Sequence, residues 1–127
     1  MAPSLVDRAR REMMIETGIL NLVKFMNLVR HNEIEKVEKR LNDPDMQAIG
    51  GANIWDDSGQ YPVHVAAAEG HTEMLRMLVD RGADIDQMTN GDHRTALHYA
   101  VINKDRETIR YLVDMGAKTD VKDVSGP

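Results

Sequence analysis

Histidine is the residue type in this chain best suited to chemistry, because a neutral imidazole can bind zinc or act as a general base near neutral pH. The 127-residue sequence has five histidines and no cysteine, which excludes disulfides and cysteine-based zinc sites. Histidine ligands of zinc are typically spaced as in H-x3-H. His64 and His71 are seven positions apart, and His93 and His98 are five apart. The spacing therefore predicts no zinc site.

Other chemical motifs are also incomplete. An EF-hand loop needs oxygen ligands at positions 1, 3 and 5, Gly at 6 and Glu at 12. Neither the segment that begins at Asp84 nor the one that begins at Asp120 continues in this way. Gly50 and Gly51 lack the lysine and the further glycines of a phosphate-binding loop. The sequence also shows no recognisable pairing of a nucleophile with a general base. We therefore expect no enzyme activity, no cofactor and no metal.

A fixed offset of 34 positions relates the histidines and several other landmarks. It joins His64 to His98, Ala66 to Ala100, Leu78 to Leu112, and the pair Gly82-Ala83 to Gly116-Ala117. A period in this range indicates tandem repeats, each of which folds as one supersecondary unit. The two histidines hold the same place in each copy, which favours a structural role over a catalytic one.

The stretches QYPVHVAAAEGH at 60–71 and RTALHYAVINKD at 94–105 resemble the ankyrin repeat, whose T-P-L-H-x-A motif has a period of about 33. The resemblance implies an all-α repeat solenoid in which helix-turn-helix repeats are joined by β-hairpin-like loops. It also implies that the histidine rings bond to neighbouring backbone and join adjacent hairpins. The structural motif positions are Pro62, His64, Gly70, His71, Gly82, Thr95, His98 and Gly116. Proline suits the first turn of a helix, and glycine commonly ends one.

We expect one domain, 1–127, organised as a stack of repeats. Its parts are an N-terminal helix at 4–18, a degenerate capping repeat with a long loop at 19–55, repeats at 56–89 and 90–123, and the start of a further repeat or a tail at 124–127. The degenerate repeat follows from aligning Asn32 with Gly70, and its long connection spans 46–53. Terminal repeats are expected to be atypical because they cap the stack.

Two features of the ends stay open. Residues 4–30 form either one kinked helix or two helices with a break near Thr17-Gly18, and we favour two. The N-terminal helix either caps the core or docks a partner. The chain ends where another repeat is expected to begin, which indicates a segment of a longer array, the interpretation we favour, or a natural end with a tail.

Charge is distributed unevenly along the chain. Residues 56–89 contain seven acids and two bases, whereas acids and bases balance on either side, so the net charge of −5 comes from this repeat. The imbalance argues against a nucleic-acid partner, which would need clustered Lys and Arg. It permits a protein partner with a basic segment, although a solvated acidic face is the alternative. No apolar run is long enough for a membrane span, and the lack of cysteine favours an intracellular protein, cytoplasmic or nuclear.

The resemblance implies a concave face, lined by hairpin tips and by the first helix of each repeat, that binds partners. Its variable positions correspond to Asp57, Ser58, Gln60, Ala68 and Glu69 in one repeat, and to Gly91, Asp92, Arg94, Ile102 and Asn103 in the next. In the degenerate repeat only Arg30 and His31 can be placed. Trp55 and Met88 are further apolar contact candidates, since Trp is enriched among interface hot spots. The alternative for Trp55 is packing against the connection at 46–53.

These observations lead to a first hypothesis of a non-catalytic protein-interaction module that binds a partner protein through the concave face. A second hypothesis makes the chain the regulatory or targeting domain of a larger enzyme or channel. A third makes it a small free-standing regulator that resembles the short ankyrin-type inhibitors of kinases. The reading frame beyond Pro127 discriminates between the last two.

Overall fold

The computed structural model describes residues 22–48 and 50–121, and every regular element in those ranges is helical. Residues 22–30 are helical, whereas the segments 4–18 and 124–127 lie outside the described residues. The chain continues through α2 (Ile34–Leu41), α3 (Pro44–Ala48), the 3-10 helix η1 (Gly51–Asn53), α4 (Pro62–Ala68), α5 (Thr72–Asp80), α6 (Ala96–Ile102) and α7 (Arg106–Asp114). The expected all-α repeat fold is confirmed. No helix in the described part is both long and apolar enough to cross a bilayer.

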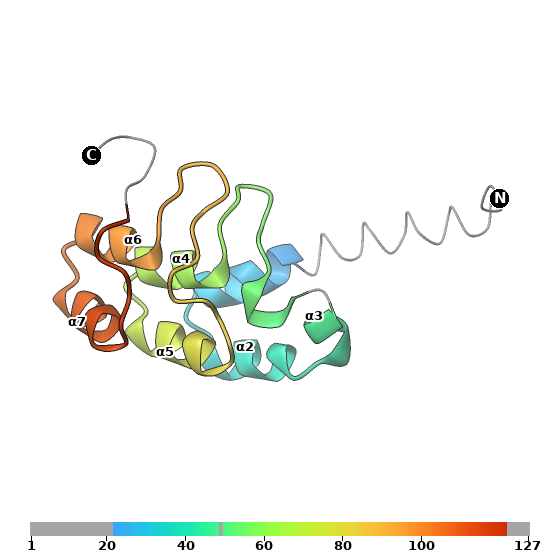
Figure 1. Cartoon of the computed structure of the whole chain (residues 1–127). Coiled ribbons are helices and arrows are strands. Elements are labelled where there is room, and N and C mark those ends of the chain that lie inside the picture. Colours follow the sequence, from blue (N-terminus) through green and yellow to red (C-terminus); the bar gives the residue numbers. More distant parts are fainter. Residues whose placement is uncertain (1–21, 49, 122–127) are drawn as a thin grey trace, which may run out of the picture.

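The helices form two rows, and the loops project to one side (Figure 1). The outer row contains α2, α5 and α7, and the inner row contains α4 and α6. Helix α4 packs against α5 and α6, α6 packs against α7, and α5 contacts both α2 and α7. The loops 54–61 and 87–95 rise together from the side of the inner row. Each helix pair with its loop is therefore one unit stacked on the next. We call them the first unit (22–30 and α2), the middle unit (α4 and α5) and the last unit (α6 and α7).

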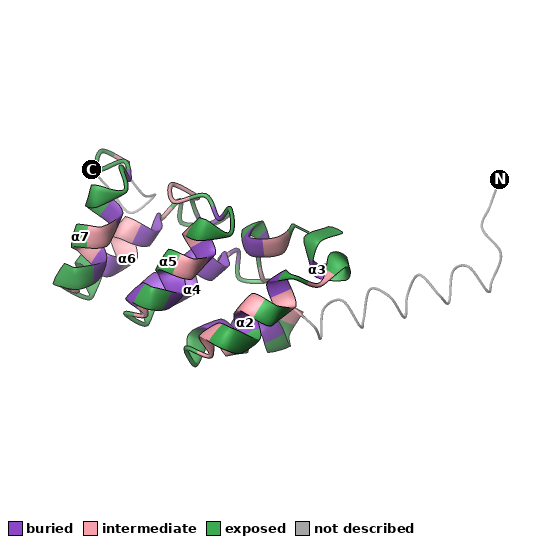
Figure 2. Ribbon diagram, turned by 90° about the horizontal axis from the view of Figure 1, so that it is seen from below, coloured by how far each residue is buried: buried purple, intermediate pink, exposed green. Residues whose placement is uncertain are grey.

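The core lies between the two rows (Figure 2). On α4 the small side chains Ala66 and Ala67 are fully buried, so neighbouring helices can approach the inner row closely. Larger aliphatic side chains come from the outer row, where Leu75, Leu78 and Leu112 are also fully buried. Burying one such leucine side chain contributes about 1.5–3 kcal/mol. The stack is thus held by narrow inner helices and bulkier outer ones.

Each inner helix ends at a residue in the left-handed region. Gly70 has a φ of 72°, and Asn32 and Lys104 at the equivalent turns have φ values of 59° and 55°. This agreement supports the alignment of Asn32 with Gly70. A Cβ atom makes the left-handed conformation unfavourable for most residues, whereas asparagine tolerates it better and glycine readily adopts it. Lys104 is therefore a strained position in the last unit.

The connection at 46–53 differs from the loop expected there. It begins inside α3, which starts at Pro44, and it ends in η1. Met46 and Ala52 are only 4% and 5% exposed, so the segment folds back and buries apolar side chains against the first unit. Proline at a first helical position fits this start. Pro44 thus begins a short helix in addition to ending the preceding one.

His64 ties one unit to the loop of the next. The backbone N–H of Tyr61 donates to its Nδ1 at 2.9 Å, so the proton of the neutral ring lies on Nε2 and is donated to the carbonyl of Gln87 at 2.7 Å. His98 repeats the first contact, because its Nδ1 accepts from the backbone N–H of Thr95 at 2.8 Å. His71 bonds to the carbonyl of Arg30 at 2.8 Å. The His64 and His71 rings thus join backbone segments that are distant in sequence, whereas the His98 bond is local.

Replacing Lys104 with glycine should stabilise the protein. Removing the strain of a left-handed lysine outweighs the larger entropy of glycine in the unfolded chain, and we expect a net gain of about 0.5–1 kcal/mol. Urea unfolding measures the change. Lys104→Ala is the control, because it removes the charge but keeps the Cβ atom, and it should leave stability near that of the unchanged protein. Equal stability of the glycine and alanine variants would contradict the role of backbone strain.

Stability should fall as the pH drops below about 6.5, the ordinary pKa of histidine. Burial lowers the pKa of His64, even though the bonds to the Gln87 and Arg94 backbone and the charge of Asp56 oppose the shift. The native state therefore binds fewer protons than the unfolded state between the lowered pKa and 6.5, and stability rises with pH across that window. Urea unfolding from pH 5 to 8 should show this slope, and His64→Gln should reduce it.

If the glutamine variant folds poorly, an NMR titration of the His64 ring in the unchanged protein measures the pKa of that ring independently. A ring that titrates at or above pH 6.5 would contradict the account.

Candidate functional site

The loop 54–61 is held in shape by one carboxylate. Asp56 Oδ1 accepts hydrogen bonds from the backbone N–H groups of Ser58 and Gln60, each at 3.0 Å, and from the Ser58 hydroxyl at 2.6 Å. The backbone N–H of Asp56 also donates to the Gln60 carbonyl at 2.9 Å. Asp57, at the tip, is exposed. The loop therefore presents its tip from a fixed backbone.

The next loop, 87–95, is bonded to the first. The Asn90 backbone N–H donates to the Gly59 carbonyl at 3.0 Å, and the Tyr61 hydroxyl donates to the Asn90 side chain at 3.3 Å. Gly59 has a φ of 82°, and a Cβ atom there would lie 3.1 Å from the Cβ of Asn90. Glycine is thus required both for the turn and for the close approach. The two loops form one surface rather than two independent arms.

We call this surface the loop face and define it by the loops 54–61 and 87–95 together with the C-terminal ends of α4 and α6. An aromatic row runs from it into the core. The Trp55 and Tyr61 rings are 5.8 Å apart, the Tyr61 and His64 rings 5.6 Å, and the His64 and Tyr99 rings 5.9 Å. Trp55 is 54% exposed, while its ring partner Tyr61 is buried. The exposed indole is therefore supported from beneath by an aromatic ring.

The candidate contact residues divide into two groups. Gln60, Ala68 and Asn103 join neighbouring units, because Gln60 Nε2 donates to the Tyr99 hydroxyl at 3.1 Å and Asn103 Nδ2 donates to the Ala68 carbonyl. Exposed candidates are Trp55, Asp57, Ser58, Glu69, Met88, Gly91, Asp92 and Ile102, together with Arg30 and His31. Arg94 and Ile102 also line a cavity at the last unit.

The bases of the middle unit lie away from the loop face, whereas its exposed acids occur on both faces, with Glu73 and Asp80 on α5. Both of its bases lie on or next to α5: Arg76 is 3.8 Å from Glu73 and lies over the Tyr111 ring, while Arg81 contacts Glu38 at 2.6 Å. The exposed acids Asp57 and Glu69 lie on the loop face. The middle unit therefore contributes acidic side chains, but no basic side chain, to the loop face.

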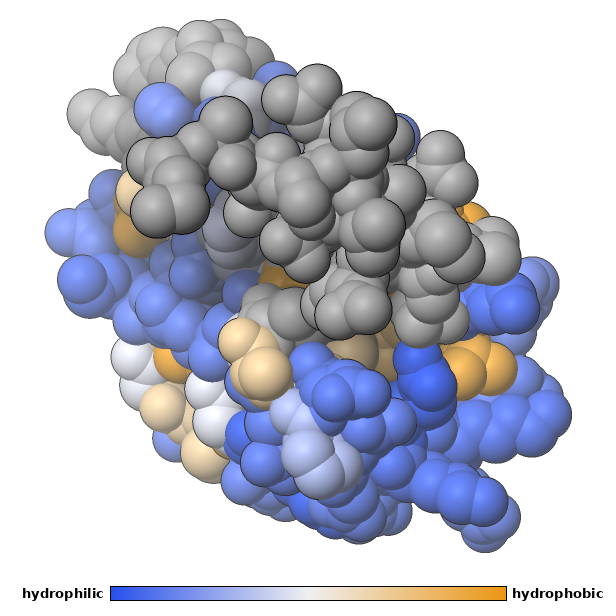
Figure 3. Space-filling view, turned by 90° about the vertical axis from the view of Figure 1, so that its right-hand side faces the viewer, coloured by the Kyte–Doolittle hydropathy of each residue, from blue (hydrophilic) through white to orange (hydrophobic). Residues whose placement is uncertain are grey.

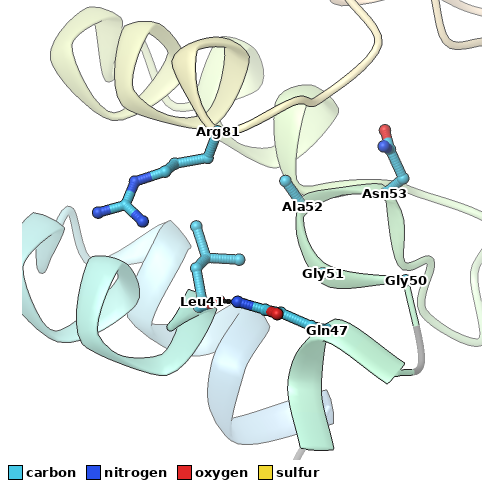
Figure 4. Close-up of a pocket in the computed structure, with 7 residues that line it drawn as sticks. All are labelled: Leu41, Gln47, Gly50, Gly51, Ala52, Asn53 and Arg81. Atoms are coloured by element: carbon cyan, nitrogen blue, oxygen red, sulfur yellow. Dashed lines mark hydrogen bonds between the residues drawn. The ribbon is translucent and has the colours of Figure 1, made fainter. Parts of the chain in front are cut away.

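A cavity of about 250 Å³ lies between the first and middle units (Figure 4). The Arg81 guanidinium beside it also donates to Asn42 at 2.6 Å, and Gln47 donates to the Leu41 carbonyl at 3.2 Å. These polar groups are engaged by the protein itself. Seen from the side of α3, the described surface is mainly hydrophilic (Figure 3). Within the described ranges no group of three or more metal-binding side chains occurs.

Sequence reasoning missed several polar contacts between units that do not involve histidine. Asn53 donates to the Gly82 carbonyl and accepts from the Asp84 backbone N–H, each at 3.0 Å, and Thr72 bonds to Thr108 at 2.8 Å in the core. A polar residue such as Asn53 beside a turn is a weak signal, since its usual interpretation is local turn chemistry.

Comparison with known proteins agrees with this architecture. A family model described as ankyrin repeats, in three copies, matches residues 15–123. The NF-kappa-B inhibitor cactus of Drosophila melanogaster is 36% identical over 105 residues, which is 78% of this chain and 21% of that protein. SH3 and multiple ankyrin repeat domains protein 2 of Homo sapiens is 32% identical over 111 residues, 84% of this chain and 6% of that protein.

The probable 26S proteasome regulatory subunit p28 of Saccharomyces cerevisiae is 39% identical over 70 residues, 54% of this chain and 30% of that protein. The chain thus spans less than a third of the length of each of these curated relatives.

Asn103→Ala should destabilise the fold by about 0.5–1.5 kcal/mol, the usual contribution of one hydrogen bond, because the Ala68 carbonyl loses its partner from the next unit. Urea unfolding is the measurement. Glu69→Gln, an exposed change beside the same carbonyl, is the control and should stay within about 0.5 kcal/mol. An Asn103→Ala variant as stable as the unchanged protein would show that the amide does not join the units.

Proposed function

The chain belongs to the ankyrin-repeat family, and we propose that it binds a partner protein through the loop face, without chemistry of its own. Ankyrin repeats are generally protein-interaction modules and not catalysts. The proposal for this chain adds the surface used and the chemistry of the partner. We also propose an intracellular location, cytoplasmic or nuclear, which the lack of cysteine supports.

The observation that carries the proposal is an exposed tryptophan on a preorganised loop. Trp55 is the only tryptophan of the chain, it is 54% exposed, and its ring lies on buried Tyr61. Tryptophan supplies a large contact area at low conformational cost, and it is enriched among the residues that dominate binding energy. Because the bonds of Asp56 hold the loop, little ordering is needed on binding.

The charge of the loop face supports a partner with a basic segment. Asp57 and Glu69 are exposed there, and Asp92 is exposed at the neighbouring loop tip. Arg76 and Arg81 are engaged by Glu73 and Glu38 beyond this face. A lysine or arginine of the partner would meet acids here, and an arginine would also stack on the indole of Trp55.

A second candidate function is the regulatory or targeting domain of a larger protein. The observation that favours it is the length of the relatives, of which this chain covers 6–30% in the three cases described above. Both functions use the same binding face. Reading the gene on both sides of the segment that encodes 1–127 tests the second one, since a catalytic or membrane domain in that frame would support it and the lack of such a domain on either side would contradict it.

Affinity capture with the immobilised domain, followed by identification of the bound proteins, tests the proposed function. The loop-face variant combines Trp55→Gln, Asp57→Asn and Glu69→Gln. We expect it to retain the helical circular dichroism of the unchanged domain but to lose at least about tenfold of its affinity for the captured partner, as expected when a hot-spot tryptophan is removed.

The matched control places the same kinds of substitution on the outer helices, as Val113→Gln, Glu73→Gln and Asp114→Asn. Val113 is 47% exposed, which is close to the exposure of Trp55. The control should bind within about twofold of the unchanged domain. Full binding by the loop-face variant, or loss of binding in the outer-helix variant, would contradict the proposed surface.

The salt dependence of binding tests the basic segment separately. Exposed charge pairs are screened as ionic strength rises, so affinity should fall between low and high salt. The fall should be smaller for a variant with only Asp57→Asn and Glu69→Gln. A salt dependence that is the same for both proteins would leave the loop face as the binding surface but contradict the basic partner.

A further inference from the structure

The turn of the loop 87–95 contains an asparagine followed by a glycine, Asn90-Gly91, and this pair occurs nowhere else in the sequence. In such a pair the backbone nitrogen of the glycine can attack the side-chain carbonyl carbon of the asparagine, because glycine has no Cβ atom to hinder the approach. Each of the other six asparagines is followed by a residue with a side chain. Asn90 and Gly91 are also both exposed. This position is therefore the one in the chain best suited to the reaction.

The surroundings leave both reacting groups accessible. A Cβ atom at Gly91 would meet no heavy atom within 4 Å outside its two chain neighbours, so the space beside the backbone is open. Among the described residues, neither the Gly91 N–H nor the amide nitrogen of Asn90 has a hydrogen-bond partner. The amide nitrogens of Asn53 and Asn103, by contrast, donate to carbonyls of neighbouring units. Those two amides are held by the nitrogen that would have to leave, whereas the Asn90 amide is not.

The Asn90 side chain is held by its oxygen instead. The Tyr61 hydroxyl donates to Asn90 Oδ1 at 3.3 Å, and Tyr61 is itself buried, so the donor has a fixed position. A donor at this oxygen stabilises the negative charge that develops on it when the carbonyl carbon is attacked. The fold therefore places a hydrogen-bond donor at the atom where charge develops and leaves the nitrogen on the same carbon free to depart.

We propose that Asn90 deamidates spontaneously and that the loop face thereby gains a carboxylate as the protein ages. The Gly91 nitrogen forms a bond to Asn90 Cγ, the bond between Cγ and Nδ2 breaks, and the departing ammonia takes up the proton of the Gly91 N–H. The product is a five-membered succinimide ring. Water then adds to one of the two ring carbonyls and opens the ring, which leaves aspartate or isoaspartate. In sum, one amide and one water become one carboxylate and one ammonium ion.

The product changes the surface that we assign to binding. The new carboxylate adjoins the exposed Asp92 and shares the loop face with Asp57, so this face becomes more acidic. An isoaspartate also lengthens the backbone by one methylene just after the N–H that donates to the Gly59 carbonyl. The effect on a basic partner rests on the function proposed above, whereas the reaction at Asn90 is independent of it.

Incubation of the full chain at neutral and at mildly alkaline pH, followed by peptide mass spectrometry, tests the reaction. The peptide that contains Asn90 should gain one mass unit, because an OH group replaces an NH2 group. The gain should be faster at the higher pH, where more of the attacking nitrogen is deprotonated. The peptides that contain Asn53 and Asn103 are internal controls and should keep their mass.

Two variants test the geometry. Gly91→Ala fits the open space and should slow the gain, since its methyl group hinders the attack. Tyr61→Phe should slow the gain in the folded protein but not in urea, where the Tyr61 hydroxyl no longer lies beside Asn90. An absent gain at Asn90, an equal gain at Asn53 and Asn103, or an undiminished rate in Gly91→Ala would overturn the proposal. A folded Tyr61→Phe variant that reacts as fast as the unchanged protein would overturn the role of the hydroxyl.

Asn90→Asp imitates the aspartate product and tests the effect on binding. A labelled hexa-arginine peptide is the probe, at low salt because exposed charge pairs are screened at high salt. The variant should bind it up to about fivefold more tightly, the effect of one exposed ion pair.

Asn42→Asp is the matched control for this measurement. It adds the same charge after α2 in the outer row, and its carboxylate can keep the bond from Arg81. It should bind the peptide as the unchanged protein does. Equal affinity of the two variants would overturn the effect on a basic partner, while the mass gain at Asn90 would still decide whether the reaction occurs. A failure of the loop-face variant to weaken partner binding would overturn the proposed function without touching the mass measurement.

Discussion

The arrangement of the units depends on the bonds of a buried imidazole. His64 accepts from the first turn of its own helix and donates to the carbonyl of Gln87, 23 residues away. A buried polar ring is costly unless both nitrogens are bonded, and here each nitrogen has a partner. The bonds fix where the loop 87–95 leaves the stack, and that loop in turn is bonded to Gly59. One side chain thereby helps to hold the loops 54–61 and 87–95 beside each other on the surface that we assign to binding.

Scaffold and surface are separated within a few residues. Asp56 accepts hydrogen bonds from the backbone of its own loop, while Asp57 beside it is exposed. Ala67 is fully buried, while Glu69 two positions later reaches solvent. This separation lets the exposed positions vary without disturbing the fold, which suits a module whose partner is set by its surface. Gln60 and Asn103 are the exceptions, since they bond to a neighbouring unit although the repeat pattern places them at variable positions.

The sequence predicted the features that repeat locally. Helix starts and turns are formed by residues that are close in sequence, and they recur at the offset of 34. A periodic pattern therefore reveals them, as for the proline at the start of α4 and the turn after that helix. The helix α3 was not predicted, because no period in the sequence marks its buried residue Met46. The left-handed conformation of Lys104 was likewise not predicted, although the offset of 34 aligns this residue with Gly70, because lysine does not favour that region. The roles of Gln60 and Asn103 required three-dimensional contacts, as did the position of both bases of the middle unit away from the loop face.

The loop face, and not the outer row of helices, is the surface that we expect to meet the partner. Hydrogen–deuterium exchange of the domain, measured alone and in complex with the captured partner, distinguishes the two surfaces because it reports on the backbone of both at once. We expect slower exchange on binding in the loops 54–61 and 87–95 and at the end of α4, with α5 and α7 unchanged. Protection confined to α5 and α7, with both loops unaffected, would contradict it.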